Sequence, residues 1–381
     1  MTRVPATAPF FTEDDIAFIT ERFSDILRGH SFLSMYKYGE EFEESFASYV
    51  GTAHAVACNS GTSALELIFR AIGVEGKEVI TPSNTFIATV NAILNAGAIP
   101  IFADCGADMC LDPADVELRI TPETVAIAHV HIAGFVSEGV LHLKELCDRH
   151  GIHLVEDAAQ AHGSVLNGQK AGTFGTAAGF SFFSTKVMTT GEGGMVTTDD
   201  AELVRRMRSA REFGKVQRGV YVNFHESLGY NWRMPEVAAL LGIRQLDALD
   251  SFIARRREIV RRYDELLAGF NDVSIDHLEG HDSYNGFKYV ITLPRHDRSK
   301  VHASLVDSGV SPSGYVYEVP LHKMPVFPGA NSLELPGTEY MCSRHICLPV
   351  FVGLTREQGE YVVSSLERAL SIPENSLLGI A

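Results

Sequence analysis

The sequence predicts an α/β protein with a large domain, whose mostly parallel mixed sheet is sandwiched by helices, and a smaller α+β C-terminal domain. Over the first 249 residues, short apolar stretches typical of strands alternate with helical stretches, which indicates βαβ units and a sheet covered on both faces. Beyond that point a long charged helix leads into one clear strand. In this chain of 381 residues we therefore expect a large domain at 1–249, with an N-terminal helical segment, and a small domain at 250–381.

The individual elements follow from local patterns. Thr12 is a capping residue with Asp15 three positions later, so a first helix is expected there. Apolar spacing predicts further helices at 61–71, 86–96, 140–150 and 251–269. Strands are expected at 55–58, 78–81, 99–103, 124–131, 153–156, 179–183, 194–198 and 288–293. Because open α/β sheets bind ligands at the carboxyl ends of their strands, the residues at those ends are the candidates for a site.

Composition disfavours several classes of function. The formal net charge of −16 argues against nucleic-acid binding, which needs a basic face. No stretch is apolar for long enough to span a bilayer, and the first residues lack the layout of a signal peptide. None of the cysteines forms a C-x-x-C pair, so we expect reduced thiols, no zinc site and a cytoplasmic location. The cysteines are Cys58, Cys105, Cys110, Cys147, Cys342 and Cys347.

The first candidate cluster follows the strand at 55–58 and opens the next helix. It contains Ser60, Gly61 and Thr62. Free N–H groups and the helix dipole at such a start bind phosphate, and glycine lets the backbone approach the ligand. Ser60 can equally serve as an ordinary helix cap. On this segment alone, phosphate binding and capping both remain open.

The second cluster follows the strand at 153–156, where Glu156 and Asp157 end an apolar run. A carboxylate here can pair with a buried cation, such as a protonated pyridine nitrogen, or it can cap the next helix. Asp157 suits either role, and we interpret Glu156 as structural. Gln160, one turn further on, has a donor for a ring oxygen.

The third cluster contains Lys186, between the aromatic strand at 179–183 and the glycine turn at 191–194. A lysine among aromatic residues costs free energy unless its charge is neutralised or used. A desolvated, neutral amine can form a Schiff base. Ser181 adds a hydroxyl at the strand end. Taken alone, Lys186 is more simply a surface lysine, and it is the other clusters that favour the chemical role.

Two further groups have less specific patterns. Trp232, the only tryptophan, lies beside Asn231 in a segment that is either a helix entry or a loop reaching a ligand or a neighbouring subunit. His129 and His131 point to the same face of one strand. No third ligand accompanies them at a telling spacing, so packing or substrate contact is preferred over a metal site.

Taken in order, these clusters resemble the DegT/StrS family, the sugar aminotransferases of the fold-type I group that depends on pyridoxal 5'-phosphate. The resemblance covers essentially the whole chain and rests on several motifs in the right order. The motifs are Ser60-Gly61-Thr62, Pro82-Ser83-Asn84-Thr85-Phe86, Glu156 to Gly163, Ser181 to Lys186, Gly191-Glu192-Gly193-Gly194 and Gly229-Tyr230-Asn231-Trp232-Arg233.

The resemblance assigns roles by position. Lys186 matches the lysine that carries the cofactor, and Asp157 matches the carboxylate at its pyridine nitrogen, so these two are the expected catalytic residues. Phe86 matches the aromatic that stacks on the ring. Asn231 matches a residue that reaches the phosphate from a partner subunit, which implies a homodimer with shared active sites. The full expected cofactor set is Ser60, Gly61, Thr62, Phe86, Asp157, Gln160, Ser181, Lys186 and Asn231.

The family also implies the reaction. An amino group passes from glutamate to a keto group of a deoxy sugar, most often nucleotide-linked, with ping-pong kinetics, and the amino sugar serves polysaccharide or natural-product biosynthesis. Relatives with histidine in place of the lysine act as dehydratases, so Lys186 favours amino transfer. The expected substrate-side residues are His131, His322 and Trp232, in regions where the chain departs from the usual family pattern.

Two alternatives remain open at this stage. One is an aminotransferase that acts on a keto-cyclitol or an unlinked sugar. The other is a non-catalytic regulatory protein that keeps the fold and binds pyridoxal 5'-phosphate for sensing or assembly. Under every reading no nucleic acid, membrane or metal is an expected partner.

Overall fold

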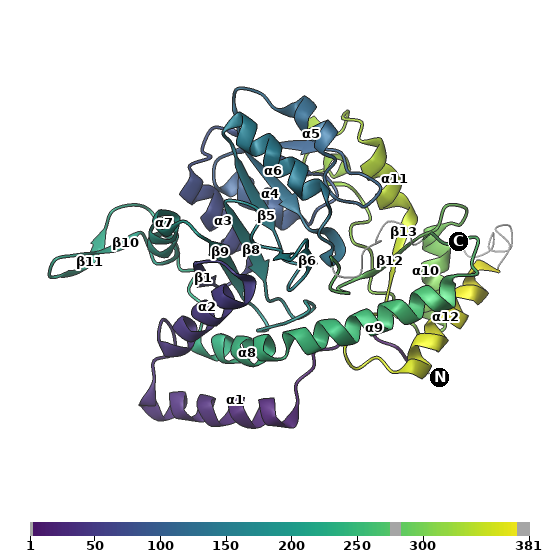
Figure 1. Ribbon diagram of the computed structural model, residues 1–381, viewed down its shortest axis with the longest axis horizontal. Coiled ribbons are helices and arrows are strands. Elements are labelled where there is room, and N and C mark those ends of the chain that lie inside the picture. Colours follow the sequence, from purple (N-terminus) through teal and green to yellow (C-terminus); the bar gives the residue numbers. More distant parts are fainter. Residues whose placement is uncertain (1–2, 275–282, 372–381) are drawn as a thin grey trace.

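The computed structural model describes residues 3–274 and 283–371, and its centre is a seven-stranded sheet (Figure 1). The strand order is β1-β9-β8-β5-β4-β2-β3, in which β9 runs antiparallel to both of its neighbours while the pairs from β8 to β3 are parallel. The strands are β1 (His54–Cys58), β2 (Glu78–Pro82), β3 (Ile99–Ala103), β4 (Thr124–Val130), β5 (His153–Asp157), β8 (Ala177–Ser181) and β9 (Gly194–Thr198). The predicted mostly parallel mixed sheet is confirmed.

Helices cover both faces of this sheet (Figure 1). On one face lie α3 (Gly61–Ile72), α4 (Ile87–Asn95) and α7 (Ala201–Arg211); on the other lie α2 (Lys37–Val50), α5 (Pro113–Arg119), α6 (Gly139–His150) and α8 (Glu236–Asp247). Side chains of one strand alternate between the two cores. On β4, Ala126 and Ala128 pack on the α3 side, and Ile127 packs on the α2 side. Burial on both faces explains why these strands are almost continuously apolar.

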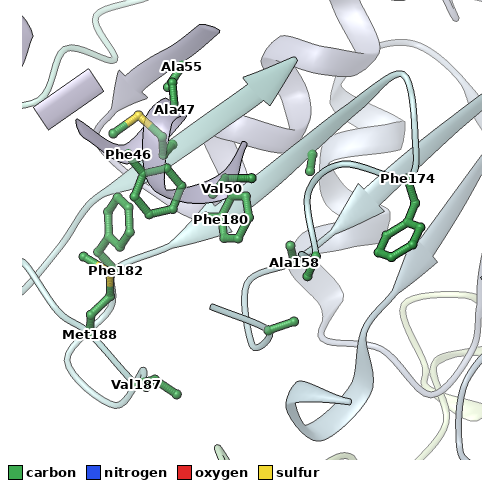
Figure 2. Close-up of a cluster of buried hydrophobic side chains, with 14 of the residues drawn as sticks. Phe46, Ala47, Val50, Ala55, Ala158, Phe174, Phe180, Phe182, Val187 and Met188 are labelled. Atoms are coloured by element: carbon green, nitrogen blue, oxygen red, sulfur yellow. The ribbon is translucent and has the colours of Figure 1, made fainter. Parts of the chain in front are cut away.

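Aromatic side chains hold the loop that carries Lys186. Phe46 of α2 contacts Phe180 and Phe182, with ring centroids 5.0 and 5.5 Å apart (Figure 2). Val187 and Met188, directly after the lysine, pack in the same buried cluster. Because both ends of the loop are fixed in the core, the position of the lysine backbone is fixed as well.

The N-terminal helix begins where the sequence predicts. In α1 (Glu13–Asp25), the Thr12 hydroxyl accepts the N–H of Asp15, and the Asp15 carboxylate accepts the N–H of Thr12. A short π-helical turn, η1 (Ile26–His30), follows. The structure also contains a hairpin, β10 (Lys215–Arg218) with β11 (Tyr221–His225), that extends away from the body of the molecule (Figure 1). A second small hairpin pairs β6 (Val165–Leu166) with β7 (Gln169–Lys170).

A smaller α+β unit follows the large sheet. Its buried core surrounds β12 (Tyr289–Thr292), which pairs antiparallel with β13 (His345–Leu348), and also includes Val130 and Ile132 of the large sheet region. The helices around it are α9 (Leu249–Leu267), α10 (Arg298–Asp307), α11 (Pro336–Arg344) and α12 (Arg356–Leu370). The division of the chain into two domains, with a boundary at residue 250, stays a prediction. Near the N-terminus, Val4 forms a bridge with Val310 of this unit. None of the helices in the described ranges is long and apolar enough to cross a membrane.

Candidate active site

Neighbouring strand ends bring the predicted residues to one edge of the sheet. β5 ends at Asp157 and the parallel strand β8 ends at Ser181. Gly194, the first residue of β9, pairs with Ser181 on one side and with Cys58, the last residue of β1, on the other. The segment 60–62, which follows β1, therefore lies beside the end of β8.

Glycine is required where α3 begins. A Cβ atom on Gly61 would lie 2.7 Å from the Cβ of Ser181, and one on Gly194 would lie 2.1 Å from the carbonyl oxygen of Ser60. The Ser60 hydroxyl also accepts the N–H of Ser63 at 3.1 Å, so it caps the helix. Both readings of this segment therefore hold together: Ser60 caps α3, and the start of α3 beside the Ser181 hydroxyl is suited to an anion.

A cavity of about 390 Å³ collects the predicted cofactor residues at this edge, with the exception of Asn231. The lining residues in that set are Ser60, Gly61, Thr62, Phe86, Asp157, Gln160, Ser181 and Lys186. The small domain closes the other side with Phe287, Lys288, Tyr315, Val316 and Tyr317. The cavity thus lies between the two domains, a usual place for a small-molecule site.

Lys186 enters this cavity from the loop after β8. Its Nζ lies 5.1 Å from the ring centroid of Phe287. Burial lowers the pKa of Lys186 to about 8; the negative charge of Asp157 opposes this shift, and the positive charge of Lys288 adds to it. An amine with this pKa has a substantial neutral fraction near neutral pH, and the neutral form is the nucleophile that attacks a carbonyl group.

The carboxylate of Asp157 is buried at the end of β5. Its Oδ2 accepts a hydrogen bond from Thr89 Oγ1 at 2.7 Å, and its Oδ1 accepts the N–H of Ala159 at 3.1 Å. Burial raises the pKa of Asp157, while these hydrogen bonds and the charge of Lys186 oppose the rise. A further cation in the cavity would stabilise the ionised form of this carboxylate.

Gln160 and Phe86 complete the walls. Gln160 Oε1 accepts the N–H of Ala133 at 2.8 Å, and its Nε2 donates to the hydroxyl of Tyr317 at 2.9 Å. Phe86 is 60% exposed, and its ring lies 6.4 Å from that of Tyr317 at an interplanar angle of 28°. An exposed aromatic face at the edge of a cavity is a surface on which a planar ligand can stack.

These features fit pyridoxal 5'-phosphate. The start of α3 suits the phosphate, because the missing side chain of Gly61 lets it lie close against Ser181 and its hydroxyl. Phe86 offers a face for the ring, and the buried carboxylate of Asp157 suits a protonated ring nitrogen. The amine of Lys186 suits the aldehyde. Each part of the cofactor therefore has a partner of matching chemistry.

Asn231 and Trp232 lie outside the cavity of their own chain. Asn231 is exposed and bridges Glu212. The ring of Trp232 is stacked on Tyr230, with 3.9 Å between ring centroids and 2° between planes. The backbone carbonyl of Trp232 accepts the N–H of Asn59 at 2.9 Å, which ties this segment to the residues just before α3. A contact of Trp232 with substrate stays a prediction.

His131 and His322 are fully buried away from the cavity lining. His131 Nε2 is 2.8 Å from the carboxylate of Glu156, which also accepts backbone N–H groups of the loop 172–175. His322 Nδ1 lies 2.7 Å from Ser83 Oγ, and its Nε2 lies 3.1 Å from Glu339. These contacts agree with packing roles for both histidines and with a structural role for Glu156. That His131 and His322 contact the substrate stays a prediction. Between residues 3 and 371, outside 275–282, no cluster of His, Cys, Asp and Glu could hold a metal ion.

A larger cavity of about 570 Å³ lies between α2, β1 and α7. Both arginines in its lining already pair with one carboxylate: Glu43 accepts from Arg211 at 2.6 Å and from Arg208 at 2.8 Å. None of the predicted catalytic or cofactor-binding residues lines it. We therefore assign the chemistry to the smaller cavity around Lys186.

Sequence reasoning missed three residues at this site: Thr89, Lys288 and Tyr317. Thr89 could have been predicted from the sequence, because it lies three residues after Phe86 and therefore near the same face of the predicted helix. Lys288 and Tyr317 come from the small domain, and nothing in their local sequence indicates that they meet residues more than 100 positions earlier.

Comparison with known proteins agrees with this geometry. The sequence profile of the DegT/DnrJ/EryC1/StrS aminotransferase family matches residues 13–367. GDP-perosamine synthase from Caulobacter vibrioides is 36% identical over 336 residues, which span 87% of this chain and 89% of that protein. The dTDP-3-amino-3,4,6-trideoxy-alpha-D-glucose transaminase from Micromonospora megalomicea is 36% identical over 340 residues, which span 87% and 89%.

Solved structures of sugar aminotransferases share the whole fold. DesV from S. venezuelae is 33% identical with a TM-score of 0.88, over 98% of this chain and 100% of that chain. The putative sugar aminotransferase Spr1654 from Streptococcus pneumoniae, in its PLP form, is 27% identical with a TM-score of 0.89, over 97% and 98%. The expected fold-type I architecture and the expected cofactor, pyridoxal 5'-phosphate, are confirmed. The chain is an enzyme that belongs to the DegT/DnrJ/EryC1/StrS aminotransferase family.

Proposed function

We propose that the protein transfers an amino group from glutamate to a keto group of a nucleotide-linked deoxy sugar. The observation that carries the proposal is the placement of Lys186 and Asp157 in one cavity with the start of α3. A nucleophilic amine, a buried carboxylate and an anion site are the three groups that a pyridoxal 5'-phosphate enzyme needs. The names of GDP- and dTDP-sugar enzymes among the relatives support a nucleotide-linked substrate.

Each residue has a defined task in this reaction. When bound, the cofactor withdraws electrons from the substrate carbon that carries nitrogen. Asp157 would hold the pyridine nitrogen in its protonated form through charge pairing. Lys186 would accept and return the proton at the substrate carbon, a task for which a pKa of about 8 is well placed. Phe86 would restrain the plane of the ring, and Gln160 would donate a hydrogen bond to its oxygen.

We further propose a homodimer with shared active sites, located in the cytoplasm. Two features support the dimer. Asn231 is exposed and outside its own cavity, as a residue that serves a neighbouring site must be. The segment 27–36 also exposes several large apolar side chains, which a partner would cover. These are Leu27, Phe32, Leu33, Met35 and Tyr36.

The direct test starts with the purified protein, which should be yellow. Borohydride should fix the cofactor on Lys186, detected by peptide mass, and Lys186→Ala should show no such adduct. Glutamate should then bleach the yellow form, and a panel of keto sugars with and without a nucleotide should restore it selectively. A wild-type protein that takes up no pyridoxal 5'-phosphate would contradict the proposal. Cofactor uptake without bleaching by any amino acid would instead indicate a non-catalytic protein.

A further inference from the structure

The cavity is lined by one positively charged side chain, that of Lys288, to which no part of the cofactor has been assigned. Its charged lining residues are Asp157, Lys186, Glu192 and Lys288. The first two are assigned to the cofactor, and Glu192 is exposed at the glycine turn. Lys288 is partly buried, and it is the remaining positive charge in the lining.

Lys288 and Lys186 both lie beside the ring of Phe287. It directly precedes β12, and its backbone N–H donates to the carbonyl of Ala133, so its position is tied to the large domain. The Nζ of Lys288 lies 5.4 Å from the ring centroid of Phe287, and the Nζ of Lys186 lies 5.1 Å from the same centroid. The positive charge of Lys288 also contributes to the lowered pKa of Lys186, after burial, which is the largest cause.

The ammonium group of Lys288 uses only part of its hydrogen-bonding capacity. It donates to the carbonyl of Ser313, which leaves two of its three N–H groups for a ligand. In the part of the chain that the structure describes, no Asp or Glu pairs with it. Burial lowers the pKa of Lys288, so an anion placed beside it would recover free energy that desolvation costs.

We propose that Lys288 binds the α-carboxylate of the amino-acid donor; this inference rests on the proposed aminotransferase function. In any α-amino acid the carboxylate is bonded to the same carbon as the reacting nitrogen. It must therefore lie near the position of Lys186 Nζ, in the part of the cavity that Phe287 and Lys288 line. The phosphates of a nucleotide sugar are several bonds away from the keto carbon, so they fit this place less well. A charge-assisted hydrogen bond is the contact expected between the two groups.

The test compares Lys288→Met, which keeps the length of the side chain without its charge, with Lys288→Arg, which keeps a charge. Lys144→Met is the matched control, because Lys144 is half exposed and pairs only with Asp148 in the described structure. Yellow protein at the wild-type level shows that each variant folds and binds the cofactor. The measurement is the apparent dissociation constant of L-glutamate, from the concentration dependence of bleaching. GDP and dTDP are tested separately as inhibitors of the same reaction.

For Lys288→Met we expect the glutamate constant to rise on the order of tenfold to a hundredfold. Lys288→Arg should recover part of this loss, and Lys144→Met should match the wild type. An unchanged glutamate constant in Lys288→Met would overturn the inference, and so would an equal loss of inhibition by the nucleotides. If glutamate fails to bleach the wild type, the assigned donor is wrong. Alanine and glutamine, which have the same α-carboxylate, then test Lys288 in its place.

Discussion

At the residue scale, the chemistry depends on two charges of opposite sign in one cavity, the partly buried Lys186 and the buried Asp157. Burial drives the pKa of Lys186 down and that of Asp157 up, so each residue moves toward its neutral form. Their mutual attraction limits both shifts. Part of Lys186 is therefore neutral and able to act as a nucleophile. The carboxylate of Asp157 is expected to form a complete ion pair only when a protonated pyridine ring binds beside it.

The uptake of pyridoxal 5'-phosphate by the apoenzyme should accordingly depend on pH. Only neutral Lys186 attacks the aldehyde, so the rate constant of covalent capture should rise with pH and level off above about 8. The negative charge of Asp157 raises the pKa of this lysine, so Asp157→Asn should move the midpoint to lower pH. Stopped-flow absorbance measures the rate, and Nα-acetyl-lysine under the same conditions corrects for ionisation of the aldehyde itself. A midpoint near 10, the value of an ordinary lysine, would contradict the assignment.

The residues that sequence reasoning reached are those with a local signature. Lys186 has an aromatic run before it and a glycine turn after it, and Asp157 ends an apolar strand. Tyr317 and Lys288 have no such signature, because they meet the site only through the packing of the small domain. His322 shows the opposite case: a histidine in a suggestive loop is buried, and its ring lies between Ser83 and Glu339. Only the tertiary structure shows that Tyr317 and Lys288 line the cavity and that His322 does not.

At the element scale, the anion site depends on how closely α3 approaches β8. Gly61 and Gly179 both make this possible. A Cβ on Gly179 would lie 2.8 Å from the side chain of Leu65, and one on Gly61 would lie 2.7 Å from that of Ser181. The missing side chain of Gly179 thus lets α3 lie close to β8, and the missing side chain of Gly61 lets the first turn of α3 lie against Ser181.

Gly61→Ala should therefore weaken cofactor binding through geometry, without removing any charged group. Relief of a 2.7 Å contact with Ser181 requires the start of α3 to move, and overpacking of this kind costs about 1–3 kcal/mol. We expect the dissociation constant of pyridoxal 5'-phosphate, measured by fluorescence titration, to rise about tenfold or more. Gly269→Ala is the control, because a Cβ there meets nothing within 4 Å. Wild-type affinity and stability in Gly61→Ala would show that the close approach is not needed.

The predicted strands of the large sheet match the structure closely, because each is a short apolar run that ends in a turn. The helices α2 and α8 are among those that the sequence analysis did not predict. Their N-cap residues, Tyr36 and Pro235, make no side-chain hydrogen bond to the helix, so the usual start signal is missing. The amphipathic faces that hold them become evident only against the sheet.

At the scale of the whole molecule, the large and small domains line the cavity together, and one predicted cofactor-binding residue lies outside it. The large domain provides Lys186 and Asp157, and the small domain provides Tyr317 and Lys288. Asn231 is the predicted phosphate ligand that lies outside the cavity of its own chain. Its exposure in a single chain is explained if a second copy places its own Asn231 at this site.

Shared sites predict complementation between two inactive variants. Lys186→Ala damages the cavity of its own chain, and Asn231→Ala damages the cavity of its partner. In a mixed dimer both lesions therefore fall on one site, and the other site is intact. Equal co-expression should give about a quarter of wild-type activity, because half of the dimers are mixed and each has one working site. Lys186→Ala combined with Asp157→Asn is the matched control: both lesions act within their own chain, so no mixed dimer has an intact site. Activity in the first mixture that stays at the average of the two single variants would refute shared active sites.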